Sequence, residues 1–257
     1  MTTRNRLLSV LTPLAVGAVF FALWEWLVVS QDIKPYLLPK PSAIWTQINE
    51  NWDVIWPAMV ATGTNALIGL IAGTVVAVIA AFIASRFKVL GEITAPAAIA
   101  INAMPIIGLA AIFNIIFDST TSVPRRLVVT LVVMFPVFVN VLKGLTQVDP
   151  THLELVRSYA ASDSTILRKV RVPNALPYLF VGLRLAASLC VISAVVAEYF
   201  GGLQNGLGNK ITSAAANSNF PRAWAFVAAS CWLGLAFFIV GVAAERLVSG
   251  RSRPAPR

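Results

Sequence analysis

The sequence predicts an all-α membrane protein with six transmembrane helices. Of its 257 residues, 58% are hydrophobic and only 12% are charged, whereas soluble domains carry about 25% charged residues. Apolar runs of about 20 residues recur along the chain, which is the length that an α-helix needs to cross the hydrocarbon core of a bilayer. Because no tandem repeat, low-complexity block or soluble domain interrupts this pattern, residues 1–257 are predicted to form one transmembrane domain.

The first apolar run is longer than the apolar part of a signal peptide, and no small-residue cleavage site follows it, so we expect a retained helix. The fourth run is the shortest, and Pro136 inside it predicts a kink. Cys190 and Cys231 both fall inside runs, where we expect them to act as small apolar residues, with no disulfide or metal site. The six predicted spans are Leu11–Ser30, Ala58–Ala84, Ala97–Phe117, Leu127–Leu142, Leu176–Tyr199 and Ala223–Glu245.

The distribution of positive charge predicts the orientation of these spans. With the N-terminus inside, 13 of the 20 Lys and Arg residues lie on the cytoplasmic side, 6 lie outside, and Arg184 lies within a span. Cytoplasmic loops of membrane proteins carry an excess of Lys and Arg, so we expect both termini in the cytoplasm. Topology and anionic lipid then explain the net charge of +9, and no nucleic-acid partner is required.

An external segment is predicted between the first two spans. It contains Leu37–Trp45, LLPKPSAIW, in which two prolines favour extended chain and Ser42 is a suitable N-cap for a short helix. Trp45, Trp52 and Trp56 suit the aromatic belt at a membrane surface. A surface amphipathic helix and a plain connecting loop explain the segment equally well.

Small residues at four-residue spacing predict close helix packing in lipid. Gly69 and Gly73 have this spacing in the second span, and the fifth span carries small residues at Gly182, Ala186, Ser193 and Ala197. The pattern indicates a helix bundle, either within one chain or with a second copy of it.

The segment between the fourth and fifth spans, residues 149–173, is polar and has the pattern of two short helices. Asp149 is a suitable N-cap and Pro150 a suitable first helical residue, and Leu153, Val156 and Ala160 would share one apolar face. Ser162 begins a second start signal, after which Ile166, Leu167 and Val170 lie on one side and Arg168, Lys169 and Arg171 crowd the end.

Pro173 and Pro177 are then expected to stop the second short helix and to begin the next span. The predicted product is a helix–turn–helix on the cytoplasmic surface. A segment that only packs on its own bundle would show the same periodicity, and the two interpretations have equal support from the pattern alone.

Residues 154–173 resemble the EAA loop of the permease subunits of bacterial ABC importers. The loop pattern is Glu-Ala-Ala, three residues, Gly, nine residues, Ile, one residue, Leu-Pro. This chain keeps the spacing with Glu154, Leu155, Val156, Ala160, Val170, Val172 and Pro173. Ala175–Ala186, Val195–Gly202 and LLPKPSAIW are similar to the nitrate, sulfonate and taurine branch of these permeases, whereas AAIFNIIF is more similar to permeases for pyrimidine-type vitamin precursors.

The resemblance implies a type I ABC importer permease-like bundle in the bacterial cell membrane, with a cytoplasmic coupling helix. It also implies an ATPase subunit dimer that binds ATP-Mg, a second permease copy in a homodimer, and an external binding protein. The solute would be a sulfonate-, nitrate- or taurine-like anion or a pyrimidine-like heterocycle. The residues implied in ATPase coupling are Glu154, Leu155, Val156, Tyr159, Ala160, Ala161, Ser162 and Pro173.

Ala160 departs from the family pattern, which has Gly at this position. Gly could serve a left-handed backbone, where Ala costs about 1–2 kcal/mol, or it could serve only to be small where a partner approaches. We expect the second explanation, because a small residue at a close interface requires no backbone strain.

The polar residues within the spans are few. Asn usually bonds a neighbouring helix in a membrane, and the resemblance makes Asn102, Asn114, Asn140 and Glu198 candidates for the translocation pathway, with Glu198 near an external gate or docking point. Arg184 and Glu198 are about 21 Å apart along one helix and cannot pair with each other. We expect Arg184 to have an anchoring role and Glu25, between two tryptophans, to be interfacial.

No residue pattern predicts catalysis by this chain. The sequence has no G-x-x-x-x-G-K-[ST] phosphate loop, and its single histidine, His152, is expected at a surface or interface. A secondary transporter or channel that works alone is the main alternative, but it predicts inverted repeats or ionisable residues at a midplane site, which the sequence lacks. A structural anchor would leave residues 149–173 without a role.

Overall fold

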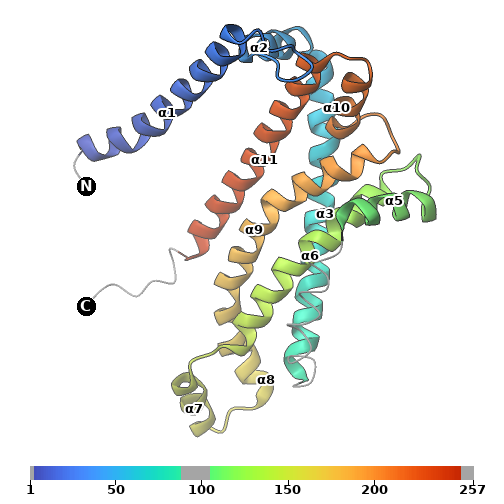
Figure 1. The fold of residues 1–257 in the computed structure, drawn as a ribbon. Coiled ribbons are helices and arrows are strands. Elements are labelled where there is room, and N and C mark those ends of the chain that lie inside the picture. The colour runs from blue at the N-terminus through green and yellow to red at the C-terminus, as the bar shows by residue number, and fades with distance from the viewer. Residues whose placement is uncertain (1–2, 88–104, 250–257) are drawn as a thin grey trace.

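The computed structural model describes residues 3–87 and 105–249, in which all regular secondary structure is helical (Figure 1). Within these residues, five helices are long and apolar enough to cross a membrane. These are α1 (Thr3–Ser30), α3 (Trp52–Arg86), α6 (Val123–Thr146), α9 (Val172–Tyr199) and α11 (Phe220–Ser249). A shorter apolar helix, α5 (Ile106–Ile116), covers part of the predicted third span, and residues 97–104 of that span lie outside the described residues.

Short polar helices lie at the two ends of the bundle. The helices α2 (Pro41–Glu50) and α10 (Leu207–Ala216) lie at one end, and α7 (Pro150–Ser158) and α8 (Asp163–Ile166) lie at the other (Figure 1). We call these the α10 end and the α7 end.

The helix that contains the fourth predicted span, Leu127–Leu142, extends beyond it at both ends. The helix α6 begins at Val123 and therefore includes Arg125 and Arg126, which the charge pattern had placed in an external loop. A hydropathy criterion stops at charged residues, but Arg125 is 1% exposed and has hydrogen-bond partners inside the protein. The helix also continues through Pro136.

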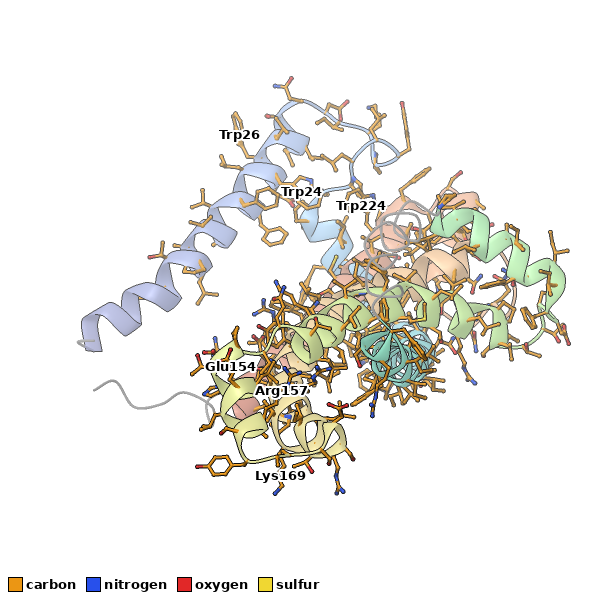
Figure 2. The ribbon with its side chains drawn as sticks, turned by 90° about the horizontal axis from the view of Figure 1, so that it is seen from below. Trp24, Trp26, Glu154, Arg157, Lys169 and Trp224 are labelled. Carbon is orange, nitrogen blue, oxygen red and sulfur yellow. The ribbon has the colours of Figure 1, made fainter. Side chains whose placement is uncertain are left out.

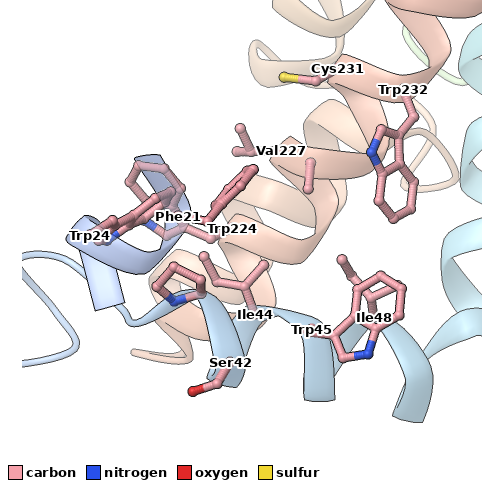
Figure 3. Close-up of a pocket in the computed structure, with 12 residues that line it drawn as sticks. Phe21, Trp24, Ser42, Ile44, Trp45, Ile48, Trp224, Val227, Cys231 and Trp232 are labelled. Atoms are coloured by element: carbon pink, nitrogen blue, oxygen red, sulfur yellow. The ribbon is translucent and has the colours of Figure 1, made fainter. Parts of the chain in front are cut away.

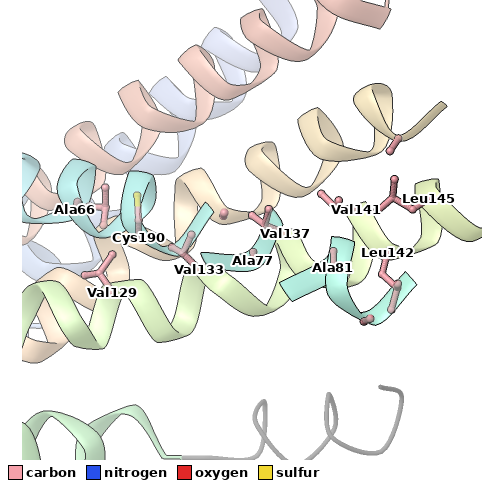
Figure 4. Close-up of a cluster of buried hydrophobic side chains, with 14 of the residues drawn as sticks. Ala66, Ala77, Ala81, Val129, Val133, Val137, Val141, Leu142, Leu145 and Cys190 are labelled. Atoms are coloured by element: carbon pink, nitrogen blue, oxygen red, sulfur yellow. The ribbon is translucent and has the colours of Figure 1, made fainter. Parts of the chain in front are cut away.

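The core of the bundle is formed where α3, α6 and α9 pack together (Figure 4). Alanines at Ala66, Ala77 and Ala81 of α3 meet a row of buried valines on α6, and Cys190 of α9 joins the same cluster. Small side chains on one helix let branched side chains of the next approach closely, which is the main source of helix association in lipid. The valines are Val129, Val133, Val137 and Val141.

Gly69 and Gly73 allow α3 and α6 of the same chain to cross at close distance. A Cβ atom at Gly73 would lie 2.6 Å from the carbonyl oxygen of Thr130. On α9, Gly182 similarly approaches the backbone of Val137. The small-residue pattern therefore marks contacts inside one subunit.

We expect Gly73→Ala to lower the free energy of unfolding by about 1–3 kcal/mol, because the added methyl group overpacks the α3–α6 crossing. Thermal unfolding in mild detergent, followed by size-exclusion chromatography, measures the loss. Gly17→Ala on α1 is the control, since a Cβ there meets no atom within 4 Å and Ala favours a helix interior. Equal stability of the two variants would contradict the packing argument.

The first helix, α1, runs away from the bundle and contacts it near α2 and α11 (Figure 1). Trp24 meets Trp224 of α11 with ring centroids 5.7 Å apart. The Glu25 carboxylate accepts hydrogen bonds from the Ser42 backbone N–H (3.0 Å) and hydroxyl (2.7 Å). Ser42 therefore joins α1 to α2 and is not the predicted N-cap, because α2 begins at Pro41, one residue earlier.

Candidate functional site

The helix α7 begins as the sequence predicts. The Asp149 carboxylate accepts a 2.8 Å hydrogen bond from the backbone N–H of Thr151, and Pro150 opens the helix. The hydrogen bonds from the Thr151 backbone and side chain lower the pKa of Asp149, and the charge of His152 contributes in the same direction. This cap fixes the first turn of a helix that has little other support.

No residue of α7 is buried. The side chain of Leu155 is 55% exposed and that of Tyr159, just after the helix, is 79% exposed. Glu154 is also exposed, and Figure 2 shows it with Arg157 on α7 at the α7 end of the bundle. Leu153 and Val156 of the predicted apolar face are half-buried, so part of α7 lies against its own chain while Leu155 and Tyr159 remain open to a partner.

Ala160 has a left-handed backbone, with φ of +53°. It follows the last turn of α7, where its N–H donates a 2.9 Å hydrogen bond to the carbonyl of Arg157. Helices commonly end with a left-handed residue at this position, usually Gly. The expectation that Ala160 needs only to be small was therefore wrong, because the chain must reverse here between α7 and α8.

We expect Ala160→Gly to stabilise the end of α7 by about 1 kcal/mol, because Gly adopts a positive φ without steric cost. Amide hydrogen exchange at residues 157–160 should then slow about fivefold. Ala161→Gly is the matched control, since Ala161 does not have a positive φ, and it should leave exchange unchanged or faster. Slowing by both variants would contradict the assignment of strain to Ala160.

The predicted stop at Pro173 does not occur. The Ser162 hydroxyl accepts from the N–H of Thr165 and caps α8, and a π turn at Leu167–Arg171 (η1) joins α8 directly to α9. Pro173 and Pro177 lie near the start of α9 and do not end the helix, because the π turn before Pro173 leads the chain into α9 without a break. The end of the α7–α8 segment is therefore continuous with a helix that crosses the bundle.

A second polar site lies at the α10 end. The Glu198 carboxylate, 0% exposed, accepts from the Thr62 hydroxyl (2.9 and 3.1 Å) and from the backbone N–H of Gly208 (2.9 Å). The Thr62 hydroxyl also accepts from the N–H of Leu207. Glu198 and Thr62 thus cap the start of α10 and tie it to α9 and α3.

Arg125 of α6 completes this site. Its guanidinium donates to Asn205 (3.1 Å) and Asn209 (3.3 Å), and to the carbonyl oxygens of Gly201 and Leu203. We call Thr62, Arg125, Glu198, Gly208 and Asn209 the Glu198 junction.

Glycine is required at positions 206 and 208, where α10 lies against α9. A Cβ at Gly206 would overlap the Glu198 carboxylate, and one at Gly208 would overlap the carbonyl oxygen of Val195. The sequence analysis named Glu198 as a candidate, but it missed Arg125, Thr62 and Asn209, and it gave no role to Gly206 or Gly208. Glu198 faces the interior of the subunit, so its assignment to a pathway or a docking point stays a prediction without an exposed surface to support it.

The asparagines bond their own helices. The Nδ2 of Asn114 donates to the carbonyl of Ala110, and that of Asn140 donates to the carbonyl of Pro136, each at 2.8 Å. The expectation that Asn114 and Asn140 bond neighbouring helices was therefore wrong for these side-chain amide groups. Both side chains are half-buried, their pathway role stays a prediction, and Asn102 lies outside the described residues.

Arg184 forms an ion pair with Glu245 of α11, with Nη1 and Oε2 2.9 Å apart. Its partner is therefore an acid on another helix. The pair links the middle of α9 to the C-terminal part of α11, and neither residue belongs to the Glu198 junction.

A cavity of about 680 Å³ opens between α1, α2 and α11 (Figure 3). Four tryptophans contribute to its lining, and no charged residue does. Its walls come from helices that expose large apolar side chains, so it suits apolar groups of a bilayer better than a polar solute. The tryptophans are Trp24, Trp45, Trp224 and Trp232.

Together, a bundle of membrane-crossing helices and an exposed capped helix at one end define a membrane-embedded transport subunit. The family described as "Binding-protein-dependent transport system inner membrane component" matches residues 73–253, and the chain belongs to this family. It is a multi-pass inner-membrane permease of a binding-protein-dependent ABC importer.

Relatives agree with this assignment. The chain is 27% identical to a probable ABC transporter permease protein of Haemophilus influenzae, over 78% of this chain and 81% of that one. It is 28% identical to the formylaminopyrimidine transport permease ThiX of Halalkalibacterium halodurans, over 79% and 81%. A crystal structure of an amino acid ABC transporter has the same fold, with a TM-score of 0.62 and 14% identity over 77% of this chain and 96% of that chain.

Proposed function

We propose that α7 is the coupling helix through which this permease contacts an ATPase subunit. The observation that carries the proposal is the exposure of Leu155 and Tyr159 on a capped helix with no buried residue. Exposed aromatic and aliphatic side chains on a rigid element are typical anchors of a protein interface. In this proposal Glu154, Val156, Ala161 and Ser162 border the contact.

The complete importer would contain two permease copies, an ATPase dimer and an external binding protein. The permease itself would be non-catalytic and need no cofactor, because ATP-Mg would be bound by the ATPases. The large apolar side chains that α1 exposes would then be covered by lipid or by the second permease copy.

The α7 end is proposed to face the cytoplasm, with both chain termini on that side and six helices crossing the membrane. Basic residues end several elements there, including Arg86 on α3, Lys143 on α6 and Arg168, Lys169 and Arg171 in the π turn (Figure 1). This distribution agrees with the excess of positive charge on cytoplasmic surfaces. The α10 end would then face the binding protein.

The transported solute is proposed to be small and to be either a sulfonate-, nitrate- or taurine-like anion or a pyrimidine-like heterocycle. The similarity to a permease named for formylaminopyrimidine transport supports the second class. Most of the specificity would reside in the binding protein.

In the proposed mechanism, ATP-driven closure of the ATPases moves α7. Because α8 and the π turn are continuous with α9, displacement of the segment that follows α7 would tilt a helix that reaches the Glu198 junction. The bundle would change from inward-open to outward-open, and the solute would pass between the two permease copies.

A pull-down in mild detergent tests this function. The permease is expected to co-purify with the ATPase encoded beside it, and Glu154→Lys should reduce the ATPase activity recovered with it. A permease that purifies alone and moves solute into liposomes without ATP would support the secondary transporter instead.

A further inference from the structure

A polar cavity lies at the α10 end, where the chain turns from α10 into α11. Its volume is about 420 Å³, and Lys210, Ser213 and Asn217 of the α10 side face Asn219 and Arg222 of the α11 side across it. Apolar residues including Phe226 complete the lining. We call it the Lys210–Arg222 cavity. It is separate from the Glu198 junction, with which it shares no residue.

The two cations of this cavity lack an anionic partner. Neither Lys210 nor Arg222 forms an ion pair with a carboxylate in the described part of the chain, whereas Lys34 pairs with Asp32 at 2.7 Å and Arg184 with Glu245 at 2.9 Å. The Nε atom of Arg222 is buried without a hydrogen-bond partner among those residues. A buried cationic N–H without a partner is costly and indicates a bound water or ion.

Contacts within the chain position Arg222 and Asn219 at the cavity. The guanidinium carbon of Arg222 lies 6.0 Å from the centroid of the Phe226 ring, at the outer limit of a cation–π contact. The Asn219 N–H donates to the carbonyl of Ala214 (2.9 Å), and the Asn219 Oδ1 accepts from the N–H of Arg222 (3.2 Å). The Nδ2 of Asn219 is left as a further donor beside the two cations.

We propose that the Lys210–Arg222 cavity binds a small oxyanion of the sulfate, sulfonate or phosphate type. A planar guanidinium recognises two oxygens of such a group at once, and the Lys210 ammonium and the amide of Asn219 add donors from the other side. The phosphate of a lipid headgroup supplies the same chemistry as a free oxyanion. The location on the external face depends on the proposed function, but the binding chemistry does not.

Lysine acetylation of the purified full-length permease tests the proposal. The reaction is run in maltoside detergent, which carries no phosphate, while sulfate replaces chloride at constant ionic strength. Peptide mass spectrometry then gives the rates at Lys210, Lys34 and Lys143. We expect a saturable fall of about threefold or more at Lys210, as mass action requires when most sites are occupied, and no change at the other two lysines.

Variants connect the protection to the cavity. Arg222→Gln should abolish the protection of Lys210 by sulfate, whereas Arg184→Gln, which removes an arginine elsewhere, should retain it. Phosphatidylglycerol nanodiscs without sulfate test the second source, since protection there identifies a lipid phosphate as a ligand.

Protection in either the sulfate or the lipid experiment supports an oxyanion site. Parallel slowing of all three lysines, or protection that requires an added binding protein, overturns it. The assay needs no ATPase, so loss of ATPase co-purification would count against the proposed function without affecting this result.

Discussion

Arg125→Met is expected to lower the free energy of unfolding by about 3–5 kcal/mol, which is the usual cost of removing one partner from a buried charged network. Arg125 is 1% exposed, and its loss leaves the carbonyl oxygens of Gly201 and Leu203 and the amide oxygens of Asn205 and Asn209 without this donor. Methionine fills much of the volume, so the loss reports on charge and hydrogen bonds more than on a cavity. Unfolding in mixed micelles, followed by circular dichroism, measures the difference.

Two comparisons separate this effect from a general intolerance of the spans. Arg184→Met removes an arginine that forms an ion pair with Glu245, but its side chain is 39% exposed, so we expect a loss of about 1 kcal/mol or less. Adding Glu198→Gln to Arg125→Met tests the charge of Glu198 separately, since part of the stability returns only if a carboxylate without the nearby cation adds to the cost. If Arg125→Met and Arg184→Met cost the same, the Glu198 junction does not have the importance assigned to it.

The sequence predicted features that depend on neighbouring residues. Asp149 and Pro150 start α7 as expected, because an N-cap and the following turn involve residues two or three positions apart. The apolar runs located the long helices because hydropathy also depends only on residues that are close together in the sequence. The backbone of Ala160 was not predicted, because its left-handed φ depends on where the chain goes after α7.

The Glu198 junction could not be predicted, because its members come together only in the folded bundle. Thr62 and Glu198 are separated by 136 residues in the chain, and no periodicity relates them. Arg125 was assigned to an external loop because a charged residue is expected to be exposed to solvent. Two signals were present, the arginine pair at the edge of an apolar run and the glycines on both sides of Leu207, and each becomes meaningful only when α10 is placed over α3 and α9.

Leu155→Asp combined with Tyr159→Asp is expected to reduce ATPase co-purification by about 30-fold or more, which corresponds to about 2 kcal/mol for the loss of interface anchors. The two side chains lie at i and i+4, so they share one face. Both are mostly exposed in the single chain, and replacing them should therefore leave folding intact. Quantitative pull-down at several ATPase concentrations measures the affinity, and size-exclusion chromatography confirms the folded permease.

The matched control is Asn49→Asp on α2, an exposed site at the opposite end of the bundle. It adds negative charge without touching α7 and should leave co-purification unchanged. Full ATPase binding by the α7 double variant would show that exposure of Leu155 and Tyr159 serves another purpose. Weak binding by both variants would mean that added charge, and not the α7 surface, controls association. Only selective loss with the α7 variant is expected if this helix transmits ATPase movement to α9.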